Sequence, residues 1–449
     1  MLQPHSTKFS PGRILLSSFL FVIAVGSFLL SLPISRTTNI SWLNIIFTTT
    51  STTCVTGLKV VPMSAFTFFG KCIILCLIQI GGLGLMTLSF FLISLFLNLG
   101  MSTKIVAGQL LEYGFWSKTK NFLFLIIGTT FIIELIGAVF LYFPFKENMP
   151  KADAIFSALF HSVSAFCNAG ITLFDNGLEP YKTALFPLGI LAVLVFAGGL
   201  GFLVWNEVLI KIKTFIRSLK TKQKHIHFSL HFKIVMVTSF FLVFAGAIIT
   251  WLIEYQNSLK GVGIVKSIVI SLFNSMSLRS AGFQMINMQH ASTATLLVFL
   301  FLMFIGASPS STGSGIKTTT FALSIATIGA IIKNRTSVEI FGRTVPYDQV
   351  YKAITIISLS LIWIFSLTFI LLLTDGGLGF FKLFFEAVSA FSTCGYATET
   401  TPLLSTIGKI LIMITMLIGR VGSLTLILGL RKRKQKLLYS YPKERIAIS

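Results

Sequence analysis

Residues 160–171 read FHSVSAFCNAGI, and variants of this phrase return at 47–58, 273–283 and 385–396. The phenylalanines that open the four phrases are 112 or 113 residues apart. The glycines near the ends of the phrases keep the same spacing, and they are Gly57, Gly170, Gly282 and Gly395. A period held over four copies indicates an internal repeat, so we expect four related units along the chain.

Long apolar runs flank each phrase. The 449 residues are 54% hydrophobic and only 11% charged, a composition that excludes a water-soluble globule. Because a spanning helix needs about 20 apolar residues, the runs predict an all-α polytopic membrane protein with eight transmembrane helices. The predicted spans lie near 14–34, 71–97, 121–143, 183–210, 232–253, 294–305 with 320–332, 353–373 and 406–430.

Each repeat then reads as a span, a short apolar stretch, a glycine-containing loop and a second span. The third repeat also contains an expected gating loop at 306–319, inside the membrane. The predicted units are repeat one at 1–97, repeat two at 98–210, repeat three at 211–332, repeat four at 333–430, and a basic cytoplasmic tail at 431–449.

The formal charge of +22 would suggest nucleic-acid binding in a soluble protein. Here the charges must lie in the loops between spans, where they report topology. If the spans alternate in direction, 23 of the 36 Lys and Arg residues fall on one side, which the positive-inside rule makes cytoplasmic. We therefore expect a multi-pass protein in the lipid bilayer, with both termini cytoplasmic and no nucleic-acid partner.

The short apolar stretches are too short to cross a membrane. Stretches such as 151–166 and 380–391, at 1.5 Å per helical residue, reach about 18 to 24 Å of the ~30 Å hydrocarbon core. Each must enter and return on the same side. Irregular backbone at that depth is tolerated only when protein buries it or it lines an aqueous path. Four like-oriented loops around one axis along the membrane normal predict a pseudo-fourfold pore.

The loops carry small, mostly uncharged side chains and no ring of carboxylates. Backbone carbonyls are then the groups that face the axis, and they replace the hydration shell of a monovalent cation. Glycine suits such a loop because it adopts positive φ at low cost. The expected filter residues are Cys54, Val55, Thr56, Gly57, Cys167, Asn168, Ala169, Gly170, Arg279, Ser280, Ala281, Gly282, Ser392, Thr393, Cys394 and Gly395.

Two other interpretations of the loops stay open. A single phrase of this kind is typical of a helix C-cap and turn, although four copies in register favour a filter. The cysteines could instead form a metal-thiolate site. We favour small polar filler, because Cys54 and Cys167 share a repeat position that holds Arg279 in repeat three and Ser392 in repeat four.

Two features break the fourfold pattern. Residues 306–321 read GASPSSTGSGIKTTTF, which no apolar helix would contain for stability. The matching site of repeat four places Arg420 halfway along an apolar helix, which is costly and by default functional. The alternative for Arg420 is a structural ion pair with Glu134, Glu207 or Glu254. The expected gating residues below the filter are Gly306, Ser308, Pro309, Gly313, Gly315, Lys317 and Arg420.

Several motifs stand at these sites: 55–58 (VTGL), 168–170 (NAG), 279–283 (RSAGF), 81–84 (GGLG), 306–320 and 419–422 (GRVG). With them the chain resembles the superfamily of bacterial Trk/Ktr and plant HKT potassium transporters, and within it the KtrB-type pore-forming subunit. The fourth loop departs from the family pattern, with Cys394 where valine is common and Tyr396 where leucine is common. Position 307 is alanine where the gating loop usually has glycine.

The resemblance implies a homodimer in the bacterial cell (inner) membrane, each protomer with its own pore. It also implies a KtrA-like cytosolic regulatory ring that binds ATP or ADP, so that no nucleotide binds this chain. K⁺ is the expected transported ion and Na⁺ a possible activator. The alternatives are a Na⁺-coupled secondary symporter or a Na⁺-permeable cation transporter, and an enzyme is the least favoured class.

Overall fold

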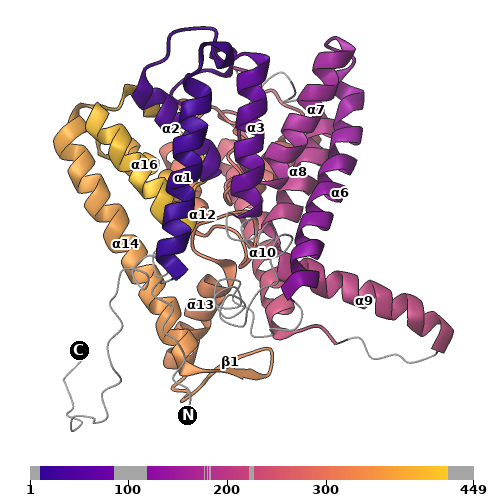
Figure 1. The fold of residues 1–449 in the computed structure, drawn as a ribbon. Helices are drawn as coiled ribbons and strands as arrows, with labels where there is room; N and C mark the ends of the chain where they lie inside the picture. Colours follow the sequence, from indigo (N-terminus) through magenta and orange to yellow (C-terminus); the bar gives the residue numbers. More distant parts are fainter. Residues whose placement is uncertain are drawn as a thin grey trace, which may run out of the picture.

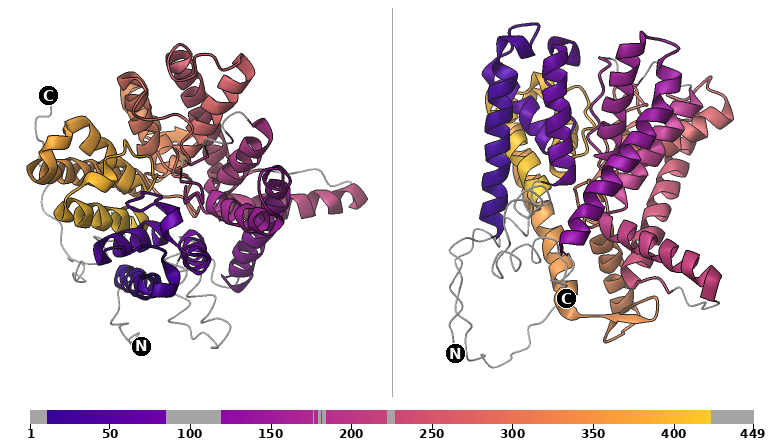
Figure 2. Two further views of the ribbon diagram at one scale, coloured as in Figure 1. Left: turned by 90° about the horizontal axis from the view of Figure 1, so that it is seen from above. Right: turned by 45° about the vertical axis from the view of Figure 1, so that its right-hand side comes forward.

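The structure is a computed structural model that describes residues 11–84, 119–175, 177–178, 181, 184–221 and 227–422. Within these residues the chain is a bundle of α-helices with one small β-hairpin (Figure 1). Seen from above, the four repeats follow one another around a common centre (Figure 2). The predicted all-α polytopic fold is confirmed.

The same order of elements recurs in every repeat. Repeat one has α1 (Pro11–Ser31), α2 (Trp42–Thr53) and α3 (Phe68–Leu83). Repeat two has α6 (Thr119–Phe145), α7 (Lys151–Phe166), α8 (Leu185–Gly199) and α9 (Phe202–Thr221). Repeat three has α10 (Leu230–Glu254), α11 (Ile264–Ser277), α12 (Thr293–Phe304) and α13 (Thr318–Ile332). Repeat four has α14 (Tyr347–Asp375), α15 (Phe380–Ser392) and α16 (Thr406–Val421).

Short 3-10 turns join some of these helices: η1 (Pro33–Ser35), η2 (Met63–Ala65), η5 (Gly376–Leu378) and η6 (Thr401–Leu403). Among the described residues, α6, α10 and α14 are each long and apolar enough to cross a membrane, and the bent pair α8–α9 adds one more if it counts as a single span. The predicted spans at 71–97 and 406–430 each extend past the described part of the chain. The four short helices α2, α7, α11 and α15 are the predicted half-spanning stretches.

In repeats three and four, an acidic residue at the end of the first span fixes the start of the second span. Ser292 and Ser405 are the N-caps of α12 and α16, and each hydroxyl accepts the N–H three residues on. The Ser292 amide donates to Glu254 Oε1 (2.9 Å), and the Ser405 amide donates to Asp375 Oδ1 (2.6 Å). These bonds satisfy amides that a helix N-terminus leaves open.

The predicted single span at 183–210 is wrong as one helix, because α8 ends at Gly199 and α9 turns away by 98°. The loop of repeat three causes the break. The Ser308 amide donates to the Gly199 carbonyl (3.1 Å), and the Phe202 amide donates to the Ser310 carbonyl (2.8 Å). Gly201 between them has φ +89°, which glycine adopts at little cost. Helix α9 consequently projects from the side of the bundle (Figure 2).

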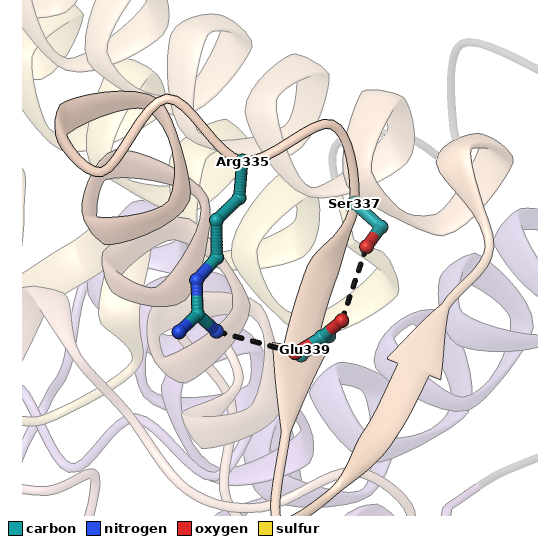
Figure 3. Close-up of polar contacts among 3 residues, drawn as sticks. All are labelled: Arg335, Ser337 and Glu339. Atoms are coloured by element: carbon teal, nitrogen blue, oxygen red, sulfur yellow. Dashed lines mark hydrogen bonds and ion pairs between the residues drawn. The ribbon is translucent and has the colours of Figure 1, made fainter.

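A β-hairpin that the sequence did not predict links α13 to α14. Strands β1 (Val338–Ile340) and β2 (Arg343–Val345) pair antiparallel, joined by Phe341 and Gly342, both at positive φ. Such two-residue turns match the twist of a hairpin. Arg335 and Ser337 both contact the Glu339 carboxylate at the base of β1, at 3.2 and 3.3 Å (Figure 3).

Candidate ion pathway

We call the four half-spanning helices α2, α7, α11 and α15 the pore helices. The loops that follow them share one backbone conformation. Each has two residues at positive φ, the loop glycine and the residue two before it. The non-glycine members are Val55, Asn168, Ser280 and Thr393, at φ +46° to +80°. Such φ values are strained for these residues, so the surrounding structure must enforce them. In all four loops, two residues in the left-handed region have one residue between them. They therefore rotate the successive peptide groups in the same sense.

The loops meet in a closed ring. A Cβ atom added to Gly57 would overlap the carbonyl oxygen of Ala169, and one added to Gly170 would overlap that of Ala281. The same holds for Gly282 with Cys394, and for Gly395 with Thr56. Each glycine therefore faces the carbonyl of the next repeat, and the fourth repeat returns to the first. The carbonyl ring consists of Thr56, Ala169, Ala281 and Cys394.

Each pore helix holds its own loop in this shape. The amide of Thr56 donates to the Ser51 carbonyl (2.7 Å), and that of Ala169 donates to the Ser164 carbonyl (2.8 Å). Ala281 and Cys394 make the corresponding bonds in the other repeats, at 2.8 and 2.9 Å. These bonds direct the amides back into the pore helices, while each carbonyl oxygen lies against the glycine of a neighbouring repeat.

A serine hydroxyl fixes the exit of the first three loops. Ser51 Oγ donates to the Leu58 carbonyl, Ser164 Oγ to that of Ile171 and Ser277 Oγ to that of Phe283, at 2.7 to 2.9 Å. In the fourth loop Tyr396 anchors the exit instead. Its hydroxyl lies 2.9 Å from Asn274 Oδ1 and 2.8 Å from the Phe283 carbonyl. Tyr396, which stands where leucine is common in the family, thus connects loop four to repeat three by hydrogen bonds.

Several buried oxygen atoms in these loops have no hydrogen-bond partner among the described residues. They are Thr53 Oγ1, Thr56 Oγ1, Asn168 Oδ1 and Thr393 Oγ1. Buried polar atoms are normally paired, so an unpaired group of oxygens needs a physical reason. Lone pairs beside a carbonyl ring are what a cation requires when it sheds water.

The side chains of Cys167 and Cys394, and of Arg279 at the repeat position of Cys54 and Cys167, make their contacts at different places. Cys167 Sγ contacts Glu134 Oε1 at 3.6 Å, and Cys394 Sγ donates to the Leu278 carbonyl at 3.0 Å. The Arg279 guanidinium contacts the Ser239 carbonyl (3.2 Å) and the Gly306 carbonyl (3.4 Å). No group of three or more His, Cys, Asp or Glu residues in the described ranges could hold a metal ion. The geometry therefore does not favour the metal-thiolate alternative.

The interrupted span of repeat three lies against the filter loops. The Ser314 amide donates to Ser280 Oγ (2.9 Å), and Ser280 Oγ donates to the Thr393 carbonyl (3.3 Å). On the other side, Asn168 Nδ2 donates to Thr312 Oγ1 (2.7 Å). The loop thus contacts loops two and three directly and reaches loop four through Ser280.

Bonds within the segment keep it folded. The amide of Ala307 donates to the Ser314 carbonyl (3.1 Å), and Lys317 Nζ donates to the Gly313 carbonyl (2.8 Å). Ser311 Oγ donates to the Ser308 carbonyl (2.6 Å). Pro309 contributes its carbonyl oxygen, which packs against Gly201.

Glycines of the second spans show how repeat three differs from the others. Gly81, Gly198 and Gly419 each pack directly on the last carbonyls of their own pore helix, at Thr53, Phe166 and Phe391. Gly306 packs instead on Ser314 and Gly315 of the interrupted segment. In repeat three the segment therefore lies between Gly306 and the pore helix, where the glycines of the other repeats contact their pore helices directly.

Arg420 joins three parts of the protein beneath the ring. Its guanidinium donates to the carbonyls of Thr312 and Gly81, and lies 3.2 Å from Ser314 Oγ. The alternative ion pair is not formed. Glu207 accepts the Ser229 amide and Glu254 accepts the Ser292 amide, while Glu134 accepts from Cys167.

Sequence reasoning missed the acceptors of Arg420, because backbone carbonyls carry no residue-type signal. It also missed the amide of Asn168 as a contact to Thr312. The motif at 168–170 contains that asparagine, but only the fold shows its partner.

Four half-spanning helices whose loops close a carbonyl ring inside a helical bundle are typical of a membrane transport protein. The chain belongs to the TrkH family of cation transport proteins, whose sequence profile matches residues 13–438. The resemblance to Trk and Ktr transporters is therefore confirmed.

Individual relatives match almost the whole chain. It is 33% identical to the Ktr system potassium uptake protein B of Bacillus subtilis, over 95% of this chain and 94% of that protein. It is 33% identical to the potassium/sodium uptake protein NtpJ of Enterococcus hirae, over 98% of both chains. The fold is similar to the crystal structure of the potassium transporter TrkH from Vibrio parahaemolyticus, with a TM-score of 0.75 and 17% sequence identity. The match covers 96% of this chain and 87% of the TrkH chain.

Proposed function

We propose that this chain takes up K⁺ across the bacterial cell membrane through the ring of Thr56, Ala169, Ala281 and Cys394 carbonyls. The observation that carries the proposal is the cyclic contact of each loop glycine with the next repeat's carbonyl. A ring of backbone oxygens suits an alkali cation because it substitutes for water without adding a fixed charge. The names of the potassium uptake relatives support K⁺ as the substrate.

The four pore helices add to this preference for cations. Helices α2, α7, α11 and α15 all end at the ring, so the negative ends of their dipoles are directed at it. Anions are disfavoured there. The unpaired oxygens of Thr56, Asn168 and Thr393 are available as further ligands.

Below the ring, the segment 306–319 and Arg420 form the proposed gate. A cation that passes the guanidinium at 4 Å meets a repulsion of about 4 kcal/mol at an effective dielectric of 20. That barrier corresponds to about a thousandfold slower passage if nothing relieves it. Since Thr312 and Ser314 both accept from Arg420, movement of the segment would also release the arginine.

Regulation is proposed to come from a second protein. The relatives named as parts of a Ktr system support a KtrA-like cytosolic ring that binds ATP or ADP, and a homodimer of this chain. The units at 1–97, 98–210, 211–332 and 333–430 would then present their basic loops and both termini to the cytoplasm. Co-purification of a ring-forming protein, with flux higher in ATP than in ADP, tests this part. Full nucleotide-independent regulation by the chain alone would contradict it.

The experiment for the main proposal is ion flux in proteoliposomes. We expect K⁺ to move passively down its electrochemical gradient, without Na⁺, and with K⁺ preferred over Na⁺. The name of the Enterococcus relative favours one competing function, a Na⁺-permeable transporter, which would give a permeability ratio near one. A strict requirement for a Na⁺ gradient would instead establish a coupled symporter. Added Na⁺ on both sides tests its role as an activator.

A further inference from the structure

The exit of loop four lacks the anchor that the other three loops have. In loops one to three, a serine hydroxyl of the repeat's own pore helix donates to the carbonyl that follows the filter glycine. Ser389 stands at the same repeat position on α15, but its buried hydroxyl has no hydrogen-bond partner among the described residues. Since buried polar atoms are normally paired, the unpaired serine indicates that loop four is held in another way.

Tyr396, which directly follows Gly395, provides the anchor of loop four. Its side chain is fully buried between repeats three and four. The hydroxyl lies 2.9 Å from Asn274 Oδ1 on α11 and 2.8 Å from the Phe283 carbonyl of loop three. The ring packs edge-on against Phe299 of α12, with the ring centroids 6.0 Å apart. All three partners belong to repeat three, so the exit of loop four is anchored on the neighbouring repeat.

The partners of Tyr396 are themselves held in place. Asn274 Nδ2 donates to the Ile270 carbonyl (3.0 Å), and Asn274 Oδ1 accepts the Met285 amide (3.3 Å). These two bonds fix the orientation of the asparagine side chain, with its oxygen toward Tyr396, so the tyrosine hydroxyl is the donor. The Phe283 carbonyl also accepts the serine hydroxyl of its own pore helix. The hydroxyl of Tyr396 therefore binds to a rigid part of repeat three.

This anchor lies directly beside the carbonyl ring. Loops three and four meet where an added Cβ on Gly282 would lie 2.5 Å from the Cys394 carbonyl oxygen. Before this contact along both loops, Ser280 Oγ donates to the Thr393 carbonyl (3.3 Å), and after it the Tyr396 hydroxyl bonds to loop three. Among the described residues, the other loop junctions have a loop-to-loop hydrogen bond on one side at most. The Cys394 carbonyl is therefore the ring oxygen that is held from both sides.

We propose that Tyr396 is a positioning residue that determines ion selectivity, because its hydroxyl holds the Cys394 carbonyl at a fixed place relative to the Ala281 carbonyl. The inference rests on the proposed function and names a residue that sets the selectivity of the same ring. Na⁺ is smaller than K⁺, so a ring that can contract around the ion loses its preference for K⁺. The family resemblance does not supply this residue, since leucine is common at its position.

The experiment measures reversal potentials of Tyr396→Phe in proteoliposomes with K⁺ and Na⁺ on opposite sides. The substitution removes only the hydroxyl. Asn274 keeps the Met285 amide and the Phe283 carbonyl keeps its serine hydroxyl, so no buried group loses its last partner and the variant should fold. We expect the K⁺ over Na⁺ permeability ratio to fall about fivefold, the factor that one net hydrogen bond contributes to an equilibrium, while K⁺ still permeates.

Two matched controls accompany this variant. Ser389→Ala removes a hydroxyl that has no partner from the pore helix of the same loop, so the ratio should stay at the wild-type value. Tyr142→Phe makes the same chemical change on α6, where the Lys146 ammonium lies over the ring at 5.8 Å, and it should also keep the ratio. If Tyr396→Phe does not fold, Tyr396→Leu in the Ser389→Ala background replaces it, since leucine is common at this position in the family.

The outcomes separate this inference from the proposed function. A wild type that carries no K⁺, or that shows a permeability ratio near one, contradicts the proposed function itself. A selective wild type whose ratio is unchanged in Tyr396→Phe, or in the leucine variant that replaces it, overturns the role of Tyr396 alone. A lower unfolding temperature with an unchanged ratio would make the hydroxyl a structural support only. An equal fall of the ratio in Ser389→Ala would place the anchor at Ser389 and overturn the inference as well.

Discussion

The carbonyl ring is built alike in all four repeats, whereas the layer directly beneath it differs from repeat to repeat. In the ring, all four repeats place a left-handed residue, a carbonyl and a glycine at matching positions, although their side chains differ. In the layer beneath, repeat three has the segment 306–319 and repeat four has Arg420, while repeats one and two have neither. A ring of equivalent ligands needs matching backbones, whereas a part that can move needs one repeat to differ. The most informative tests therefore change residues of one layer and measure both K⁺ flux and the K⁺ over Na⁺ permeability ratio.

The largest effect is expected from Arg420→Ala, which removes the charge beneath the ring. K⁺ flux should rise at least about tenfold, since a guanidinium beside the path opposes cations. Deletion within 310–315 should act in the same direction, with the K⁺ over Na⁺ ratio little changed. Isotope flux into proteoliposomes measures both quantities.

Two further variants sharpen the interpretation of Arg420. Arg420→Lys keeps the charge but loses the planar set of donors to Thr312 and Gly81, so flux near the wild-type value would identify charge as the barrier. Arg335→Ala is the control, because its ion pair with Glu339 is exposed and contributes well under about 1 kcal/mol. Wild-type or lower flux in a folded Arg420→Ala would make this arginine a structural clamp.

Gly57→Ser should reduce selectivity, because it changes the ring and leaves the lower layer intact. A Cβ at Gly57 overlaps the Ala169 carbonyl and suits φ +85° poorly, so one ring oxygen must shift. We expect the K⁺ over Na⁺ permeability ratio to fall about tenfold in a folded protein.

Gly189→Ser controls for the substitution itself, since nothing lies within 4 Å of an added Cβ at Gly189 on α8. Reversal potentials in mixed K⁺ and Na⁺ solutions provide the readout. An unchanged ratio in Gly57→Ser would show that the first loop does not set selectivity.

The smallest effect is expected from Ser280→Ala, which cuts the connection between the layers. The Ser280 hydroxyl accepts the Ser314 amide and donates to the Thr393 carbonyl. Its loss should destabilise the protein by about 1 kcal/mol and lower the permeability ratio by about threefold. Ser324→Ala, whose hydroxyl bonds only within α13, is the control in thermal unfolding and flux measurements. Equal ratios in both variants would show that the layers act independently.

Much of the ring could be predicted because repetition is visible in the sequence. The half-spanning stretch at 151–166 coincides with α7, and 380–391 ends one residue before α15 does. The loop glycines at a period of 112 or 113 residues point to one axis, and they meet there. Whether the filter and gating residues perform their assigned roles stays a prediction until flux is measured.

The asymmetric features could not be predicted from the local sequence. The bend between α8 and α9 depends on Ser308 and Ser310, which arrive from another repeat. The hairpin at 338–345 is too short for its alternation to be distinguished from a loop. The predictions for 85–97, 423–430 and the tail at 431–449 concern residues outside the described part of the chain.

The contact of Gly395 with the Thr56 carbonyl has a consequence for biosynthesis, since it closes the ring between the first and last repeats. Arg420 makes a second such connection through the Gly81 carbonyl. During synthesis from the N-terminus, the ring of loop carbonyls therefore stays incomplete in the bilayer until the fourth pore helix and its loop are inserted. Unpaired polar backbone in lipid is costly, so partial chains would need shielding by insertion factors or by another subunit. Premature termination anywhere before Gly395 would therefore leave the ring open.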